Sequence, residues 1–206
     1  FLRLDFIYAY QDIQAFDLFN QIVRRDCIAE FLDVGSRLSS MLFFATTAKC
    51  FYLEQRSPNL NKLAKPFLNI EFVQGEGQKL DFPAETFKLI TCLHALEHFG
   101  LGRYGDRVDY QGDFKALVEF SRVLELRGTL LLSVPYSFSN PRIEFHKERK
   151  YSKDIISAML NDAGFTIKEH YFISPALAAS PYTQETDTYD HDAAILLVAE
   201  KKREME

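Results

Sequence analysis

Residues 30–36 read EFLDVGS, a short apolar run that stops at a glycine and a serine. The run has the length of a β-strand, and Gly35 lets the chain turn sharply after it. Similar apolar runs recur at 50–53 (CFYL), 70–73 (IEFV), 87–93 (FKLITCL) and 129–134 (TLLLSV). These runs alternate with segments of helical spacing, and this order of strands and helices indicates an α/β domain with a mostly parallel sheet. The sequence therefore predicts a mostly parallel sheet that begins at 30–34.

Segments with helical spacing of apolar residues separate these runs. Helices are predicted at 11–28, 37–48, 113–126 and 153–163. Ser152 is a suitable N-cap for the last of them, and Gly128 and Gly164 are expected to end the last two. Two further strands are predicted at 165–173 and 193–201. Alternating strands and helices indicate an α/β fold with helices on both faces of the sheet.

The length of 206 residues is enough for one large domain with a well-buried core. We expect a single domain over 1–206, with an N-terminal helical cap at 1–29 and a Rossmann-like three-layer sandwich at 30–201. The chain has 19 Phe residues and no Trp, so Phe, Leu and Ile should fill the core.

Charge and cysteine usage exclude several classes of function. The net charge of −5 argues against broad nucleic-acid binding, which needs a concentrated positive field. No apolar run approaches the roughly 20 residues of a membrane span, and the start, FLRLDFIYAY, lacks the pattern of a signal peptide. Cys27, Cys50 and Cys92 lack metal-ligand spacing, so we expect buried free thiols. These features predict a cytoplasmic protein with no metal, nucleic-acid or membrane partner.

Polar side chains and glycines follow the predicted strands, at the edge where α/β sheets bind ligands. They are Asp33, Gly35 and Ser36 after the first strand, Glu54 after the second, Glu76 and Gly77 after the third, His94 to His98 after the fourth, and Tyr136 after the fifth. Their concentration at one edge predicts a binding site there.

Read in order, these segments resemble the class I S-adenosylmethionine-dependent methyltransferases. LDVGS (32–36) is similar to that superfamily's first motif, and VQGEGQKLDFPAETFKLITCLHALEHF (73–99) to the run that leads into its fourth strand. RVLELRGTLLLSVPY (122–136) is similar to the run that builds its fifth strand. The EHFGLGRYGD segment (97–106) resembles an uncharacterised methyltransferase-like subgroup. The resemblance implies S-adenosylmethionine as cofactor and a seven-stranded, mostly parallel sheet with an antiparallel last strand.

The resemblance also assigns cofactor contacts. It implies that Glu54 holds both ribose hydroxyls, and that Glu76 and Gly77 flank the adenine. We further expect Asp33, Gly35 and Ser36 at the methionine end, together with His94 near the methyl group. Several of these residues have a simpler alternative: Asp33 would cap the next helix, Glu54 and Glu76 would face water, and Gly35 would only form a turn. Arg37 and Ser39 stand where the superfamily commonly has glycines.

His94, Glu97 and His98 would share one face of a short helical turn after the fourth strand. A histidine titrates near neutral pH, so His94 or His98 could accept a proton from the methyl acceptor. In the alternative, His98 hydrogen-bonds the backbone and only fixes the loop.

Acceptor contacts are predicted in two later segments and at Tyr136. The first is the GLGRYGD loop, where Arg103, Tyr104 and Asp106 would face the cleft. The second is the basic stretch SNPRIEFHKERKYS (139–152), where His146 and Arg149 would recognise an anionic acceptor. In the alternative, this stretch is a solvated surface.

The most favoured function is methyl transfer from S-adenosylmethionine to a small-molecule acceptor, anionic or saccharide in character. A nicotinamide-dependent oxidoreductase is disfavoured because the G-x-G-x-x-G fingerprint is missing after 30–34. The remaining alternative is a non-catalytic domain that binds S-adenosylmethionine or S-adenosylhomocysteine, or serves as a scaffold, and has kept the methyltransferase fold.

Overall fold

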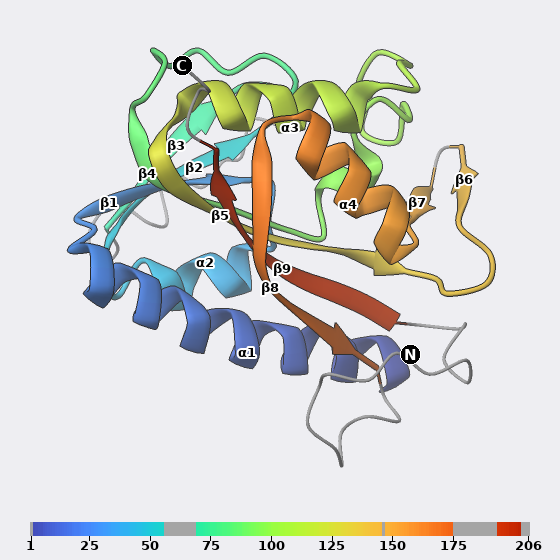
Figure 1. Ribbon diagram of the computed structural model, residues 1–206, viewed down its shortest axis with the longest axis horizontal. Helices are drawn as coiled ribbons and strands as arrows, with labels where there is room; N and C mark the ends of the chain where they lie inside the picture. The colour runs from blue at the N-terminus through green and yellow to red at the C-terminus, as the bar shows by residue number, and fades with distance from the viewer. Residues whose placement is uncertain (1, 56–68, 146, 175–192, 203–206) are drawn as a thin grey trace.

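Seven strands form a single sheet in the computed structural model, which describes residues 2–55, 69–145, 147–174 and 193–202 (Figure 1). The strands are β1 (Glu30–Val34), β2 (Lys49–Glu54), β3 (Ile70–Gln74), β4 (Phe87–Leu93), β5 (Leu124–Tyr136), β8 (Phe165–Ile173) and β9 (Ala193–Lys201). Their order is β3-β2-β1-β4-β5-β9-β8. Strands β1 to β5 pair in parallel, whereas β9 is antiparallel to both β5 and β8. This confirms the mostly parallel sheet with an antiparallel last strand.

Helices cover both faces of this sheet, which confirms the three-layer α/β sandwich (Figure 1). The helices are α1 (Leu2–Asp26), α2 (Leu38–Phe44), α3 (Gly112–Val123) and α4 (Lys153–Asp162), with a 3-10 turn η2 (Leu96–His98) after β4. A small hairpin of β6 (Arg142–Glu144) and β7 (Glu148–Lys150) precedes α4. Helices α1 and α2 pack on one face, and α3 and α4 pack on the other. Among the described helices, none combines the length and the apolar character that crossing a membrane requires.

The central strands are largely apolar because both of their faces are buried. Along β5, Leu130 and Leu132 pack toward α3 and α4, while Leu131 between them packs toward α1 and α2. The second of these two cores is built around Phe side chains, as the composition predicts. Phe19 of α1 stacks on Phe44 of α2 with ring centroids 4.4 Å apart.

Two polar contacts fix α1 against its neighbours. The buried Ser133 hydroxyl of β5 donates to Gln11 Oε1 at 2.5 Å, and the Ser40 hydroxyl of α2 donates to Asp12 Oδ1 at 2.9 Å. Helix α1 begins well before the predicted residue 11. Its early turns bring Tyr8 to the edge of the sheet where the polar strand ends meet.

Several predicted element ends are wrong. Helix α3 stops at Val123, and β5 begins at once, so Gly128 lies inside the strand and does not end a helix. The pairing with β4 skips from Leu124 to Thr129, which leaves the intervening residues as a bulge. Helix α2 ends at Phe44, earlier than expected. The Ser152 cap is confirmed, because its side chain accepts from the Ile155 N–H at 3.3 Å.

The cysteines are only partly as expected. Cys50 and Cys92 are buried free thiols, which confirms two of the three predictions. Cys27 is exposed, because it follows the last residue of α1 with a positive φ of 51° that turns the chain away from the helix.

Candidate functional site

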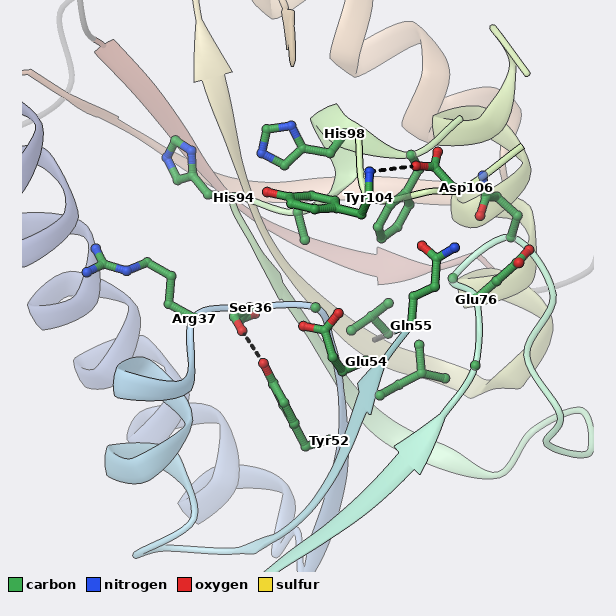
Figure 2. Close-up of a pocket in the computed structure, with 18 of the residues that line it drawn as sticks. Ser36, Arg37, Tyr52, Glu54, Gln55, Glu76, His94, His98, Tyr104 and Asp106 are labelled. Carbon is green, nitrogen blue, oxygen red and sulfur yellow. Dashed lines mark hydrogen bonds between the residues drawn. The ribbon is translucent and has the colours of Figure 1, made fainter. Parts of the chain in front are cut away.

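A cavity of about 480 Å³ opens at the carboxyl ends of β1, β2, β3 and β4 (Figure 2). The order of the sheet reverses here, because β1 has β2 on one side and β4 on the other. Ligands bind at this position in open α/β sheets. The cavity is lined by the residues that follow each strand, chiefly Val34–Leu38, Tyr52–Gln55, Gly75–Gln78, His94, Ala95, His98 and Phe99, and by Tyr104 and Asp106.

The side chain of Asp33 fixes the conformation of the loop after β1 through hydrogen bonds. This carboxylate is fully buried and accepts from Ser36 N at 3.0 Å, from Ser36 Oγ at 2.6 Å and from Thr91 Oγ1 of β4 at 2.5 Å. The Tyr52 hydroxyl of β2 donates to the Ser36 carbonyl at 2.8 Å, as Figure 2 shows. The structure does not place Asp33 in the cavity lining, where a cofactor contact was predicted. Asp33 instead shapes the Gly35-Ser36 loop, which does line the cavity.

Burial raises the pKa of Asp33 to about 7, although the hydrogen bonds from Ser36 and Thr91 oppose the shift. In the unfolded chain this carboxyl releases its proton near its ordinary pKa of 3.8. Between these values the folded state holds a proton that the unfolded state does not. The Asp33 contribution to the free energy of unfolding therefore falls as pH rises, by at most about 1.4 kcal/mol per pH unit.

We expect Asp33→Asn to remove this pH dependence, because an amide cannot ionise. Urea unfolding of both proteins between pH 4 and pH 7 measures it. The difference between them isolates Asp33 from the other titrating groups. A difference that stays constant over this pH range would contradict the prediction.

Glu54 ends β2 and lies in the wall of the cavity, opposite His98 and Tyr104 (Figure 2). Glu76 and Gly77 follow β3, and both line the cavity, with Glu76 exposed at its rim. A Cβ atom at Gly77 would lie 2.6 Å from Phe99 Cε2, so the glycine lets this ring form part of the cavity wall. These three residues therefore meet at one site, as predicted from their strand ends.

His94, Glu97 and His98 form a buried polar cluster after β4. Glu97 Oε1 lies 3.1 Å from His94 Nδ1 and 3.7 Å from His98 Nε2. The side chains of Glu97 and His94 are only 2% and 9% exposed. His98 Nδ1 lies 2.6 Å from the Lys147 carbonyl oxygen. The predicted clustering of the three is correct, and His98 also makes the backbone contact of the alternative interpretation.

His94 has a backbone φ of +52°, which is uncommon for a side chain larger than glycine. Its N–H still donates to the Ser133 carbonyl at 2.9 Å, so the chain turns immediately after the last β4 pairing. Within the part of the chain that the structure describes, no three His, Cys, Asp or Glu side chains group as metal ligands.

The loop between η2 and α3 is organised by Asp106. Its two carboxylate oxygens accept from Gly102 N at 3.1 Å and from Tyr104 N at 3.2 Å. Both Tyr104 and Asp106 line the cavity, as predicted. Arg103 does not; its guanidinium donates to the Lys147 carbonyl at 2.9 Å and lies 5.3 Å from the Tyr104 ring centroid. Arg103 therefore packs against the Tyr104 ring and stabilises this part of the cavity wall without lining the cavity.

Gly100 closes this loop, and we expect Gly100→Ala to destabilise the fold by about 2 kcal/mol. Gly100 has a φ of +75°, and an added Cβ would lie 2.0 Å from the Asp109 carbonyl oxygen. Gly105→Ala is the matched control, because φ there is +86° but a Cβ meets nothing within 4 Å. It should cost only the conformational penalty, about 1 kcal/mol. Equal urea midpoints for the two variants would show that the close approach does not matter.

Three predicted acceptor contacts are not placed at the cavity. Arg149 is buried, with its guanidinium 3.2 Å from Asp113 Oδ2, and does not line the cavity. Tyr136 is 5% exposed and packs against Phe172 with ring centroids 4.9 Å apart. The structure therefore does not bring Arg149 and Tyr136 to the cavity, where acceptor contacts were predicted, because both side chains pack inside the fold. His146 lies outside the described residues.

Two residues of the site escaped the sequence interpretation. Tyr8 of α1 contacts the His94 ring edge-on, with centroids 5.0 Å apart. Arg37 lines the cavity, and its guanidinium lies 4.5 Å from the centroid of the Tyr8 ring. The sequence marks Arg37 as a charged residue in place of a motif glycine, but this did not identify it as a residue of the site. Tyr8 carries no local signal, because only the packing of α1 brings it to the site.

The chain is similar to the uncharacterized methyltransferase YcgJ of Bacillus subtilis (strain 168). The two are 28% identical over 149 residues, which are 66% of this chain and 54% of that protein. The match thus spans about half of the length of YcgJ. The crystal structure of YcgJ superposes with a TM-score of 0.63 at 20% identity, covering 92% of this chain and 99% of that one.

Two other solved structures show how widely this fold is used. The 1,6-didemethyltoxoflavin-N1-methyltransferase of Burkholderia thailandensis, solved with 1,6-didemethyltoxoflavin and S-adenosylhomocysteine, has a TM-score of 0.67 at 18% identity, covering 98% of this chain and 88% of that one. The [4+2]-cyclase SpnF has a TM-score of 0.65 at 15% identity, and the match covers 91% of this chain and 81% of that one. At these low identities, the structural similarity shows that the chain has the class I methyltransferase fold.

One family model matches residues 59–188, which is more than half of the chain. The matched segment contains β3, β4, η2, the loop with Tyr104 and Asp106, and β5. It thus includes much of the cavity wall described above. The chain belongs to the family described as Caenorhabditis protein of unknown function, DUF268.

Proposed function

We propose that this protein transfers a methyl group from S-adenosylmethionine to a small-molecule acceptor. The observation that carries the proposal is the position of Glu54. Its carboxylate ends β2 inside the 480 Å³ cavity at the reversal point of the sheet, where two adjacent hydroxyls of a ribose could both donate to it.

The residues around Glu54 fit the rest of this cofactor. Gly77, the adjacent Gln78 and Phe99 all line the cavity, and an adenine would lie against them. The buttressed loop of Gly35 and Ser36 would receive the methionine end. The positive charge of Arg37 at this end complements a carboxylate, and among the described residues no acidic side chain forms an ion pair with it. Charge and shape are therefore matched along the cavity.

When bound, S-adenosylmethionine supplies a methyl group on a positively charged sulfur, which leaves as a neutral thioether. The protein then needs no group to stabilise an anion on the leaving side. What its residues must do is align the acceptor, exclude water and take up a proton where the acceptor has one. We assign these tasks to the part of the cavity wall formed by His94, His98, Tyr104 and Asp106.

A small acceptor suits the size of the cavity, since much of it would be filled by the cofactor. The net charge of −5 disfavours a nucleic-acid substrate. The Burkholderia methyltransferase, solved with a small heterocycle and S-adenosylhomocysteine, provides a parallel in the same fold. A saccharide or an anionic small molecule remains part of the proposal, with Tyr104 and Asp106 as its contacts.

The alternative function, a non-catalytic domain with the same fold, was supported by the absence of glycines at two positions of the first motif, where Arg37 and Ser39 stand. The backbone of Arg37 has φ −62° and ψ 136°, a conformation open to any residue. The arginine therefore causes no backbone strain, and loss of the glycine does not indicate loss of the site.

Calorimetric titration tests the proposal. We expect S-adenosylmethionine and S-adenosylhomocysteine to bind and to raise the unfolding temperature, whereas NAD should do neither. Stabilisation by NAD alone would refute the proposal in favour of an oxidoreductase. No heat with S-adenosylhomocysteine would favour the scaffold alternative.

A further inference from the structure

Two polar atoms of the cluster after β4 are buried without a hydrogen-bond partner among the described residues. They are Nε2 of His94 and Oε2 of Glu97. A buried polar atom left unpaired costs about 1–3 kcal/mol, so such atoms are retained where a ligand or a function uses them. His94 is one of the residues that line the cavity, so its buried and unpaired nitrogen is a candidate contact for a ligand bound there.

The contact with Glu97 favours one tautomer of His94. Its Nδ1 lies 3.1 Å from Glu97 Oε1, and an ionised carboxylate can only accept, so beside it Nδ1 would carry the proton. In the neutral ring Nε2 then holds a lone pair. Glu97 thereby selects the tautomer and would stabilise the imidazolium that forms when Nε2 takes a second proton. This is the relation between histidine and carboxylate in a hydrolase triad.

His98 differs from His94 in a way that separates their roles. Its Nδ1 donates to the Lys147 carbonyl at 2.6 Å, and its Nε2 lies 3.7 Å from Glu97 Oε1. Both of its ring nitrogens thus have protein atoms beside them. His98 holds η2 to residue 147, whereas His94 retains one nitrogen for another partner.

We propose that His94 is the general base for a hydroxyl-bearing acceptor and that Glu97 is the residue that positions it. This inference rests on the proposed methyl transfer and narrows the acceptor to alcohols or phenols. The acceptor oxygen bonds to the methyl carbon, the carbon–sulfur bond breaks with its electron pair going to sulfur, and the hydroxyl proton moves to Nε2. The positive φ of His94 fits this role, because strained backbone is concentrated at functional sites.

Imidazole NMR of the free protein is the first test. In two-bond ¹H–¹⁵N spectra at neutral pH, we expect His94 to show a protonated Nδ1 and an unprotonated Nε2. His94→Asn assigns the signals, since asparagine tolerates positive φ. Glu97→Gln should shift the tautomer balance, because an amide can donate to Nδ1. A protonated Nε2 in the wild-type protein, or an unchanged spectrum in Glu97→Gln, overturns the proposal.

A second test uses 4-nitrophenol, whose ionised form absorbs visible light. We expect protein loaded with S-adenosylhomocysteine to increase the ionised fraction of this phenol. The signal should be lost in His94→Asn, reduced in Glu97→Gln and retained in Glu71→Gln, a surface substitution away from the cavity. No increase with the wild-type protein, or an equal increase with His94→Asn, overturns the proposal.

Calorimetry separates failure of this inference from failure of the proposed function. Glu97→Gln should bind S-adenosylhomocysteine within about threefold of wild type, a difference below 1 kcal/mol. If the wild-type protein does not bind this ligand, the proposed function is wrong, and the base assignment, which rests on it, falls with it. If it binds but His94 shows the other tautomer, only the base assignment is wrong.

Discussion

Replacing Arg149 with alanine is expected to lower the free energy of unfolding by about 3–5 kcal/mol, as removal of one partner of a buried ion pair does. The side chains of Arg149 and Asp113 are 3% and 7% exposed, and Arg149 Nε lies 3.2 Å from Asp113 Oδ2 without the alignment of a hydrogen bond. Without the arginine, the buried Asp113 carboxylate would keep only hydrogen bonds from the Tyr151 hydroxyl and the Phe114 N–H, with no positive charge beside it. Urea unfolding measures the loss.

The same guanidinium also satisfies backbone groups. It donates to the Phe99 carbonyl at 2.6 Å and to the Tyr110 carbonyl at 3.0 Å. Phe99 follows η2, and Tyr110 precedes α3, so Arg149 ties β7 to both ends of the loop between them. Phe99 lines the cavity, which means that Arg149 supports the site without touching a ligand.

Arg142→Ala is the matched control, because Arg142 belongs to the same hairpin and also pairs with an acid. Its contact with Glu144 is 2.7 Å long, but the two side chains are 34% and 30% exposed. Removing a surface pair of this kind costs about 0–1 kcal/mol. If Arg149→Ala prevents folding, Arg149→Lys keeps the charge but loses the fork that reaches both carbonyls, and should still lower the urea midpoint. Similar losses for Arg149→Ala and Arg142→Ala would contradict the prediction.

The sheet could be predicted from the sequence because its strands are buried on both faces. Runs such as FKLITCL and TLLLSV leave no polar face, and turn residues mark their ends. The end of α3 could not be predicted, since the helix passes directly into β5 and the glycine that suggested a helix end belongs to a bulge. Such a junction is decided by pairing with β4, which no local pattern encodes.

The site was predictable where it depends on strand ends. Gly35, Glu54, Gly77 and His94 meet because parallel strands bring their carboxyl ends together. Arg149 was misjudged for the opposite reason: its buried partner, Asp113, lies on another element, and a run of basic residues gives no sign of which one is buried. Tyr8 escaped prediction because the packing of α1 alone brings it to His94.

Glu54→Ala is expected to weaken S-adenosylhomocysteine binding about 100-fold, which corresponds to about 3 kcal/mol. Two hydroxyls would each lose a hydrogen bond to a charged group, worth about 1.5–3 kcal/mol apiece. Glu54→Gln is the milder variant, because an amide oxygen can still accept from one hydroxyl. Calorimetric titration measures all three proteins.

Glu71→Gln is the matched control. Glu71 lies on the neighbouring strand β3, and its side chain is 55% exposed and contacts Lys49 at 2.9 Å, away from the cavity. The Glu71→Gln variant should bind S-adenosylhomocysteine with the affinity of the wild-type protein. Urea unfolding of each variant without ligand separates a loss of binding from a loss of fold. An unchanged affinity in Glu54→Ala would remove Glu54 from the site and with it the main support for the proposed cofactor.

The ligand itself offers the sharper test of this contact. An S-adenosylhomocysteine analogue that lacks one ribose hydroxyl should bind the wild-type protein more weakly than the parent compound. The same analogue should lose much less affinity for Glu54→Ala, because the interaction that it lacks is already absent. Strong non-additivity of this kind indicates direct contact between two groups. Additive losses would mean that Glu54 acts through the shape of the cavity and does not hold the ribose.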